Sequence, residues 1–212
     1  MLDKLKEDFP YPDTKPNLPQ DPHGWLSPHV ESMFKPLIKN AKLIIEVGSW
    51  LGLSARFWLE NSDAHVICID TWEGSPEHHT IEEAKNKLPT LYETFIVNQW
   101  EWRDRVTPIK MWSTEALKLL SNYELKPDFV YIDANHEFND VYLDIVSARS
   151  AFPDALIGGD DWNFKNPLPE RNLEKTVKKA VKVYSSNFKE KIIANHWAWR
   201  LTGKTLPDSL EN

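Results

Sequence analysis

The chain has 212 residues, which suits one domain with enough interior to bury a core. Apolar residues make up 41% and charged residues 27% of it, a balance that excludes a disordered chain. The formal net charge of −7 argues against a nucleic-acid partner, because binding a phosphate backbone requires a basic surface.

The N-terminal segment is rich in proline, with Pro10, Pro12, Pro16, Pro19 and Pro22. Proline lacks the N–H group that a helix interior needs. Residues 1–24 therefore predict an extended arm, which either wanders or lies over the body of the protein. We place the end of this segment, the arm, at residue 26.

A helix is predicted directly after the arm. Ser27 suits the N-cap position, and Pro28 suits the first helical position. Apolar residues at helical spacing give this helix one buried face, formed by Val30, Met33, Phe34, Leu37 and Ile38.

Predicted strands and helices alternate through the rest of the chain. The strands are mostly short apolar runs, typical of parallel sheets covered on both faces: Leu43–Val47, His65–Ile69, Val106–Lys110, Asp128–Ile132 and Ala155–Gly158. The helices are predicted at about Leu53–Asn61, Thr114–Ser121, Phe138–Ser150 and Leu173–Tyr184. Two final runs, Lys191–Asn195 and Ala198–Thr202, predict a hairpin.

This order predicts an α/β fold, a doubly wound and mostly parallel Rossmann-like sheet of seven strands. Helices would cover both faces, and the C-terminal hairpin would be antiparallel. The sequence thus predicts one domain over residues 27–204, followed by a polar tail over residues 205–212.

One connection is longer than a single crossover helix requires. Residues 71–105, which we call the insertion, lie between the second and third strands. They contain a predicted helix over Ile81–Leu88 and the aromatic segment TFIVNQWEW. A connection of this length predicts either a lid over a site or a contact between subunits. If it is a contact between subunits, the protein would be a homo-oligomer.

The stretch LIIEVGSWLG, residues 43–52, places an acid and two glycines where the first strand ends. Ligands of open α/β sheets bind beyond the carboxyl ends of the strands. Gly48 permits a tight turn there, and Gly52 is expected to let the backbone approach a ligand closely. Asp70 ends the second strand, where a carboxylate can accept two hydrogen bonds from a ribose diol. These residues predict a cofactor that contains a nucleoside.

The acid in this turn argues against a dinucleotide, since the pyrophosphate fingerprint GxGxxG has a glycine where this chain has Glu46. The segment EVGSWLG resembles the E/D-x-G-x-x-x-G motif of class I S-adenosylmethionine-dependent methyltransferases. The similarity extends over residues 40–202, and IDTWEGS and MWSTEA resemble the adenine-side elements of these enzymes.

The resemblance implies a contact from Asp70 to the ribose. It places Trp72 beside the adenine and Trp112 with Ser113 on its far side. For both tryptophans, packing of the insertion on the sheet is an equally open role. The full set of implied cofactor-binding residues is Glu46, Gly48, Ser49, Gly52, Asp70, Thr71, Trp72, Trp112, Ser113 and Asp133.

Acidic residues also follow the fourth and fifth strands, in the segments DFVYIDANHEF and ALIGGDDWN. Asp133 ends the first of these strands, and Asp160 and Asp161 end the second. Carboxylates on adjacent strand ends repel one another unless a cation lies among them. Hard oxygen ligands suit Mg²⁺, which Ca²⁺ or Mn²⁺ could replace. The sequence therefore predicts a divalent cation held by Asp133, Asp160 and Asp161.

This arrangement resembles the metal site of cation-dependent O-methyltransferases, which include the catechol type and the macrolide and aminocoumarin sugar type. The segment YIDANHEFNDVYLDI followed by GGDDW is most similar to methyltransferase family 24, to which the macrocin-type enzymes are related. Catechol-type enzymes have a lysine three positions after the first Asp, where this chain has His136. The resemblance implies His136 or Asp133 as the base that takes the acceptor proton. A local hydrogen-bonding role at the helix entry is equally open for His136.

We therefore predict an S-adenosylmethionine-dependent methyltransferase that acts on a hydroxyl of a small, sugar-like acceptor with the help of Mg²⁺. Two alternatives remain. An NAD-linked oxidoreductase on a similar sheet is disfavoured by the missing GxGxxG and Tyr-x-x-x-Lys patterns. A non-catalytic nucleoside-binding or assembly module is also open, since fold does not decide function. N-methylation is open too, although an acidic site suits hydroxyls better.

Nothing in the sequence indicates export or a membrane. The N-terminus MLDKLKEDF lacks the basic start and apolar stretch of a signal peptide. No run approaches the ~18 apolar residues of a membrane span. The single cysteine, Cys68, lies in an apolar strand and is expected to be a buried core residue. These features predict a cytoplasmic protein without a membrane partner.

Overall fold

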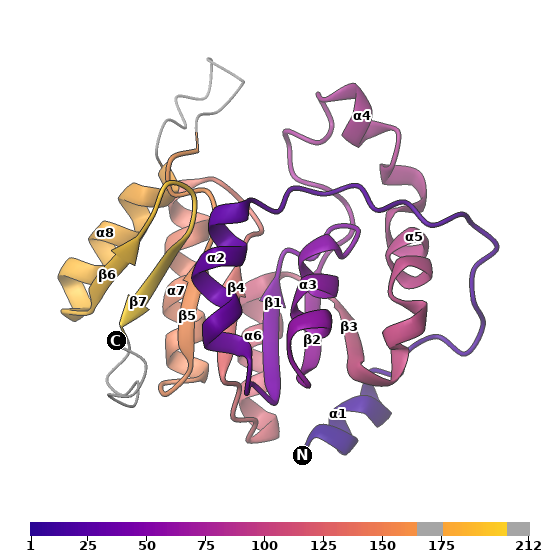
Figure 1. Cartoon of the computed structure of the whole chain (residues 1–212), viewed down its shortest axis with the longest axis horizontal. Coiled ribbons are helices and arrows are strands. Elements are labelled where there is room, and N and C mark those ends of the chain that lie inside the picture. The colour runs from indigo at the N-terminus through magenta and orange to yellow at the C-terminus, as the bar shows by residue number, and fades with distance from the viewer. Residues whose placement is uncertain (165–175, 203–212) are drawn as a thin grey trace.

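The protein is built on a seven-stranded sheet with helices on both faces (Figure 1). This computed structural model describes residues 1–164 and 176–202; the predicted tail and the start of the helix predicted at Leu173–Tyr184 lie outside them. The strand order is β3-β2-β1-β4-β5-β7-β6, and β7 is antiparallel to both of its neighbours. The doubly wound sheet and its terminal hairpin are thus confirmed. The strands are β1 (Leu43–Val47), β2 (His65–Asp70), β3 (Val106–Lys110), β4 (Phe129–Ile132), β5 (Leu156–Gly159), β6 (Lys191–Ala194) and β7 (Trp199–Thr202).

The helices form two layers. One layer contains α2, α3 and α5, and the other contains α6, α7 and α8 (Figure 1). Ser27 caps α2 as predicted, because its hydroxyl accepts the N–H of Val30 at 3.3 Å. The α-helices are α1 (Leu2–Asp8), α2 (Pro28–Ile38), α3 (Leu53–Asn61), α4 (Glu82–Lys85), α5 (Leu91–Asn98), α6 (Ser113–Leu120), α7 (Phe138–Ala151) and α8 (Thr176–Phe188). Short 3-10 helices are η1 (Leu88–Thr90), η2 (Trp100–Arg105) and η3 (Ser121–Tyr123).

The side chains of β1 alternate between these two layers, as the pleat of a strand requires. Ile45 and Val47 join the core on the α6–α8 side, and Ile44 joins the core on the α2–α3 side. Every residue of β1 is buried, because the strand has a neighbour on each edge and helices on each face. Glu46 is among them, so a carboxylate lies in the interior of the sheet.

The direction of winding changes between β1 and β4. From β1 the chain adds β2 and β3 on one side, and it then crosses to the other side to add β4 and β5. The crossover loops therefore diverge above the carboxyl ends of β1 and β4, which opens a crevice there. The segments singled out in the sequence for cofactor and metal binding both leave the sheet at this edge.

The arm differs from the prediction at its start. Residues 1–24 were expected to be extended, yet Leu2–Asp8 forms α1. The reason is an apolar stripe at helical spacing, in which the fully buried Leu5 packs with Leu2 and Phe9 against the core. The prolines begin only at Pro10, after this helix has ended.

Beyond α1 the arm lies over the insertion rather than wandering (Figure 1). The Tyr11 hydroxyl donates to the carbonyl of Ile96 at 2.7 Å. Asp21 forms an ion pair with Lys87 at 2.5 Å. The side chain of Asn98 both accepts from the N–H of Asp21 and donates to its carbonyl, at 2.9 and 2.7 Å. Arm and insertion therefore form one hydrogen-bonded layer.

The insertion has two parts with different environments. Its second part, α5, is largely buried, and Phe95 packs on the α2–α3 side of the core. At the end of α5, Asn98 donates to the carbonyl of Leu51, and Gln99 donates to that of Gly52. This part supports the turn after β1 from behind. The helix predicted at Ile81–Leu88 is shorter in the structure: α4 has only four residues, and the 3-10 helix η1 begins at Leu88.

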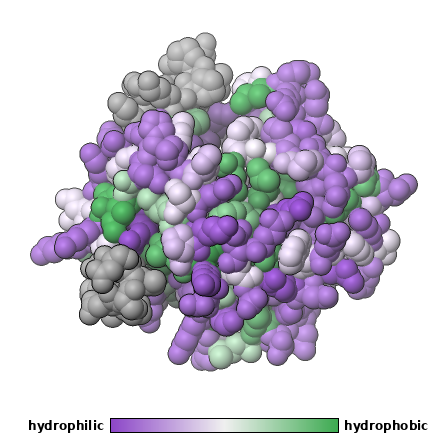
Figure 2. Space-filling model, viewed as in Figure 1, coloured by the Kyte–Doolittle hydropathy of each residue, from purple (hydrophilic) through white to green (hydrophobic). Residues whose placement is uncertain are grey.

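The first part of the insertion, residues 73–81, carries residues that line a cavity, and we call it the lid loop after the lid that the length of the insertion predicts. The face of the molecule shown in Figure 2 is mostly hydrophilic, with hydrophobic side chains gathered near its middle. None of the helices in the described residues combines the length and the apolar character needed to cross a membrane.

The junction at Asn98 predicts a measurable effect. Asn98→Ala removes hydrogen bonds to both the arm and the turn after β1, so unfolding free energy should fall by about 1–3 kcal/mol. The arm should also become a site of rapid proteolysis. Asn86→Ala is the matched control, because Asn86 is exposed and makes only a long contact of 3.5 Å with Glu82. Denaturant unfolding with equal losses in both variants would contradict this role.

Candidate active site

A cavity of about 580 Å³ lies beyond the carboxyl ends of β1, β4 and β5. Its walls come from six separate parts of the chain: the end of the arm, the turn after β1 with the start of α3, the lid loop, the segment after β4, the segment after β5, and the turn between β6 and β7. Several of its lining residues are aromatic. The full set of lining residues is Gly24, Trp25, Leu26, Ser27, Gly48, Ser49, Trp50, Leu53, Ser54, Glu77, His78, Ile81, Asp133, Ala134, His136, Asp160, Asp161, Phe164 and Trp197.

Residues 48–52, which we call the glycine loop, form the turn that the sequence predicted. Gly48 has a φ of +88°, and its N–H donates to the carbonyl of Ile69 on β2 at 2.8 Å. A Cβ at this position would lie only 2.2 Å from the carbonyl oxygen of Asp133. Glycine is therefore required both by the backbone angle and by the close approach of the β4 end.

Gly52 is also required, but for a reason that differs from the prediction. It has a φ of +83°, and a Cβ there would lie 2.2 Å from the side chain of Gln99 on the insertion. Phe95 lies beyond it, at 3.1 Å. Gly52 thus permits the close packing of α5 behind the loop. It does not line the cavity, so the expected approach to a ligand is not seen at this residue.

Glu46 of β1 and Ser49 of the glycine loop have unused hydrogen-bonding atoms. Trp58 on α3 donates its indole N–H to Oε1 of Glu46 at 2.8 Å, which fixes the carboxylate. The other oxygen, Oε2, and the Ser49 hydroxyl are buried without a hydrogen-bond partner. Burial raises the pKa of Glu46 above its usual value. Buried polar atoms of this kind are costly unless a ligand satisfies them.

Asp70 connects the glycine loop to the start of the insertion. Its two carboxylate oxygens accept the backbone N–H groups of Trp50 and Trp72, at 2.8 and 2.7 Å. Both tryptophans have positive φ angles, 48° and 51°, which are uncommon for bulky residues. Each oxygen keeps a second lone pair, so Asp70 can still accept hydrogen bonds from a ligand.

The adenine-side residues have mixed positions. Trp72 is buried, packs on Tyr92 and Phe95, and donates its indole N–H to the carbonyl of Trp50. It therefore has the packing role that the sequence left open, rather than a place beside a ligand. Trp112, by contrast, is 64% exposed at the start of α6 and remains accessible.

The two neighbouring hydroxyl residues are partly engaged. Ser113 donates its hydroxyl to Asp144 on α7 at 2.5 Å, which holds α6 against α7. Thr71 accepts the N–H of Glu73 at 3.3 Å through its hydroxyl and stays partly exposed. Neither residue lines the cavity.

The three aspartates predicted as metal ligands, Asp133, Asp160 and Asp161, all line the cavity, and we call them the acid cluster. One ligand atom each from Asp133, His136 and Asp161 lies within 4.8 Å of the others. A carboxylate oxygen of Asp161 lies 2.7 Å from Nε2 of His136, a distance at which the two form a hydrogen-bonded ion pair. Asp160 is 8% exposed, and its carboxylate accepts the N–H of Asp161, whose φ is +60°.

The charges of this region are strongly coupled. Burial and the neighbouring Asp161 and Asp160 raise the pKa of Asp133 well above its usual value. Burial and Asp161 raise the pKa of Asp160 to about 7. Burial by itself would lower the pKa of His136, but the carboxylates of Asp161 and Glu77 outweigh it and raise that pKa to about 10. The imidazole is thus the positive charge among several buried acids.

Glu77, in the lid loop, is a further acid of the cavity that the sequence did not indicate. It is 4% exposed, and neither carboxylate oxygen has a hydrogen-bond partner. Oε1 lies 3.9 Å from Nδ1 of His136, and pairing with that imidazole lowers the pKa of Glu77 to about 2. The segment EGSPEHH carries no motif that points to this position. Only the folding of the lid loop over the sheet brings it there.

Aromatic side chains enclose the same space. Phe164 stacks on the ring of His136, with centroids 3.9 Å apart and planes 18° apart. Above the glycine loop, His78 packs on Trp50 at 4.1 Å, and Trp25 of the arm stacks on His78 at 5.5 Å. The Trp50 indole N–H also donates to His23 of the arm. The arm therefore contributes directly to the wall of the cavity.

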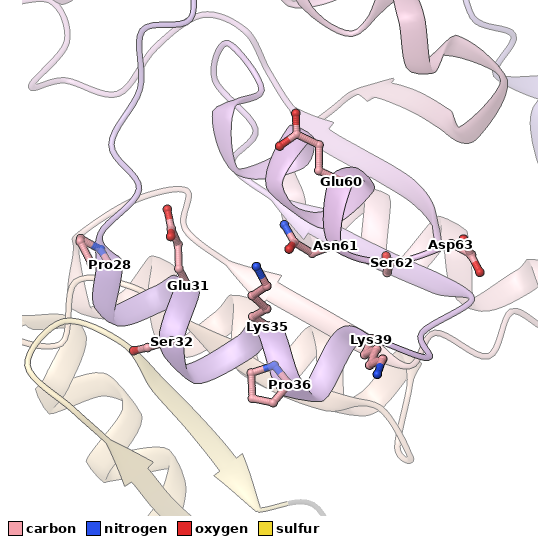
Figure 3. A pocket seen from close by; sticks show the side chains of 10 residues that line it. All are labelled: Pro28, Glu31, Ser32, Lys35, Pro36, Lys39, Glu60, Asn61, Ser62 and Asp63. Atoms are coloured by element: carbon pink, nitrogen blue, oxygen red, sulfur yellow. The ribbon is translucent and has the colours of Figure 1, made fainter.

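A second hollow, of about 920 Å³, lies between α2 and α3 (Figure 3). It is a shallow surface groove with charged side chains along the facing sides of the two helices, among them Lys35 and Glu60. It contains none of the residues at the carboxyl ends of the strands. We therefore assign the chemistry to the smaller cavity, where polar atoms without partners converge.

Residues 45–162, more than half of the chain, match the family model of a methyltransferase domain, methyltransferase family 24. No curated protein matches the sequence. Among solved structures, an O-methyltransferase from Bacillus cereus in complex with SAH is 16% identical, with a TM-score of 0.55 over 95% of this chain and 96% of the other.

Two further structures share the fold. A protein from Staphylococcus aureus, provisionally described as a caffeoyl-CoA O-methyltransferase, is 18% identical, with a TM-score of 0.57 over 95% of this chain and 90% of the other. Fibrillarin from Aeropyrum pernix, with natively bound S-adenosyl-L-methionine, is 10% identical, with a TM-score of 0.53 over 78% and 68%. At these identities the likeness establishes the fold. Together with the family match and the strand order, it shows that this chain belongs to methyltransferase family 24, among the class I S-adenosylmethionine-dependent methyltransferases.

Proposed function

We propose that the protein transfers the methyl group of S-adenosylmethionine to a hydroxyl of a small, sugar-like acceptor, assisted by a divalent cation such as Mg²⁺. The observation that carries this proposal is the shared cavity: the glycine loop and the acid cluster line the same space. A cofactor held at the first and an acceptor hydroxyl held at the second are then neighbours. Methyl transfer requires little more than this alignment, because the sulfonium already carries the charge.

The residues around the glycine loop fit the methionyl end of the cofactor. The free oxygen Oε2 of Glu46 and the Ser49 hydroxyl are buried polar atoms that a ligand ammonium and carboxylate would satisfy. Asp70 retains lone pairs for the ribose hydroxyls. Trp112 offers an exposed aromatic face for the adenine side.

The acid cluster fits a divalent cation. Asp133 and Asp161 offer carboxylate oxygens, the type that Mg²⁺ prefers, within 4.8 Å of each other and of a nitrogen of His136. Asp160 is not one of this converging group, but it lines the same cavity next to Asp161. Such a cation, when bound, acts as a Lewis acid that lowers the pKa of an acceptor hydroxyl. Within the chain, Asp133, Asp160 and Asp161 would hold it. The charge of the bound cation would favour the neutral form of His136, so that His136 or Asp133 would receive the proton.

The walls of the cavity support a neutral polyhydroxylated acceptor. Trp25, Trp50, Phe164 and Trp197 present aromatic surface, which packs well on the apolar faces of a sugar ring. Neither lysine nor arginine is found among the described lining residues, so a negatively charged acceptor would meet carboxylates without compensation. This charge distribution is the reason for preferring a hydroxylated metabolite over an anionic one.

The alternative of an NAD-linked oxidoreductase is not favoured, because Glu46 of β1 takes the place of the first glycine of the pyrophosphate motif and because the family is one of methyltransferases. A non-catalytic module on the same fold would bind S-adenosylmethionine without turnover. Methyl transfer to a panel of hydroxylated acceptors therefore distinguishes these functions.

The cofactor site predicts a defined loss of affinity. Glu46→Gln keeps the shape and the contact with Trp58 but removes the charge that would hold the methionyl ammonium. Affinity for S-adenosylhomocysteine should fall about 10- to 150-fold, the equivalent of one charge-assisted hydrogen bond at roughly 1.5–3 kcal/mol. Glu101→Gln, on an exposed residue, is the control. Calorimetry that finds equal affinity in both folded variants would overturn the assignment of Glu46.

The metal site predicts a link between Mg²⁺ and stability. A ligand that binds only the folded state stabilises it, by about 2.7 kcal/mol at a concentration 100 times its dissociation constant. Mg²⁺ should therefore raise the melting temperature of the protein. Asp160→Asn should abolish this increase while binding of S-adenosylhomocysteine remains nearly unchanged.

Asp154→Asn, on an exposed residue before β5, is the matched control and should keep the response to Mg²⁺. Methyl transfer by Asp160→Asn should fall much further than its cofactor affinity, since the cation would act on the acceptor. Full methyl transfer by chelator-treated protein would show that the cation is incidental.

A further inference from the structure

Trp50 of the glycine loop is held by contacts from several parts of the chain. Its backbone N–H donates to Asp70 at 2.8 Å, and its carbonyl accepts the indole N–H of Trp72 at 2.8 Å. Its ring packs on His78 of the lid loop. A φ of +48° is uncommon for a bulky residue and persists only where the surroundings enforce it. Since Trp50 donates to Asp70, its conformation also sets the orientation of the carboxylate assigned to the ribose.

A further contact to Trp50 comes from the arm. The indole N–H of Trp50 donates to Nδ1 of His23 at 3.2 Å. An indole nitrogen can only donate, so Nδ1 must be the accepting nitrogen of a neutral imidazole. The proton of that ring then lies on Nε2, which faces the carboxylate of Glu83 at 3.5 Å. A second proton, on Nδ1, would place two donors against each other and break the bond to Trp50.

The backbone on either side of His23 is fixed, so the imidazole is presented to Trp50 in a defined position. A Cβ at Gly24 would lie 2.8 Å from the Cβ of Leu53, which shows how closely the arm is packed on the start of α3. The ring of His23 packs edge-to-face on Trp25, with centroids 4.6 Å apart, and its side chain is only 14% exposed. The proton on Nδ1 is therefore the variable in this contact.

The charged groups around His23 come from the arm and the insertion. Asp21 accepts the backbone N–H of His23 at 3.1 Å and pairs with Lys87. Burial and the charge of Lys87 lower the pKa of His23 and outweigh Glu83 and Asp21, which raise it. His78 interacts electrostatically with His23 and has its own pKa lowered to about 4, chiefly by burial. The surroundings thus favour the neutral imidazole that the bond to Trp50 requires.

We infer that His23 is a positioning residue of the cofactor site: its neutral imidazole holds the indole of Trp50 and keeps the glycine loop in the conformation that aims Asp70 at the cofactor. This inference rests on the proposed function for the place of S-adenosylmethionine. Protonation of His23 releases the indole, so cofactor affinity falls as the solution becomes acidic. Because burial lowers the pKa of His23, this loss occurs below the usual histidine value of 6.5.

The first test follows the indole N–H proton of Trp50 by NMR in the full chain and needs no ligand. Trp50→Phe identifies the signal by its disappearance. Between about pH 8 and about pH 5 the signal should move upfield as the ring of His23 titrates, because the hydrogen bond is lost. In His23→Asn the signal should keep its position over the same range, since Oδ1 replaces Nδ1 with an acceptor that does not titrate.

The second test is calorimetry with S-adenosylhomocysteine at the same two pH values. Affinity of the unaltered protein should fall about 2- to 10-fold more than that of His23→Asn, the equivalent of one neutral hydrogen bond. Comparing these two proteins separates His23 from the other groups of the site that titrate. His79→Asn, on an exposed histidine of the lid loop, is the matched control and should keep the full pH response.

Two results would overturn the inference: an indole proton of Trp50 that does not follow the titration of His23, or an equal pH response of affinity in the unaltered protein and His23→Asn. In both cases the proposed function stands as long as S-adenosylhomocysteine binds. If the unaltered protein binds no S-adenosylhomocysteine at either pH, the proposed function fails and the cofactor role of His23 fails with it.

Discussion

The contact between Gly48 and the backbone of Asp133 is the constraint on which the rest of the site depends. β1 and β4 pair in parallel, and the N–H of Asp133 donates to the carbonyl of Val47 at 2.8 Å. The chain leaves β1 immediately afterwards through a left-handed glycine, with no room for a side chain against the end of β4. This close approach merges two neighbouring strand ends into one cavity. With any other residue at position 48, the glycine loop and the acid cluster would be pushed apart.

The second constraint is electrostatic. Several carboxylates share a mostly buried space with the charged imidazole of His136, and the elevated pKa values of Asp133 and Asp160 express how poorly this one positive charge compensates them. A protein tolerates such a concentration of like charge only where something is bound or where chemistry is carried out. The stability lost at this edge is offset by the apolar layers on both faces of the sheet, whose residues are almost completely buried.

Much of this architecture could be predicted from the sequence, because it depends on local patterns. Apolar runs ending in Glu46, Asp70, Asp133 and Asp160 define strands, and the carboxyl ends of parallel strands meet at one edge. What could not be predicted depends on contacts between distant segments. The side chain of Gln99 leaves no room for a Cβ at position 52, and Trp72 packs in the core on Phe95. Glu77 enters the site only through the path of a loop, which no spacing in the sequence encodes.

The attachment of the arm has a consequence for how the chain is made. Tyr11 and Asp21 bind Ile96 and Asn98, partners 85 and 77 residues further along the chain, and Lys6 binds the carbonyl of Asp104 at a separation of 98. Each of these arm residues precedes its partner in the chain and is synthesised well before it. Contacts this distant form late, since the loop they close must lose its freedom first. One wall of the cavity is thus synthesised well before the segment that holds it, and it reaches its place late in folding.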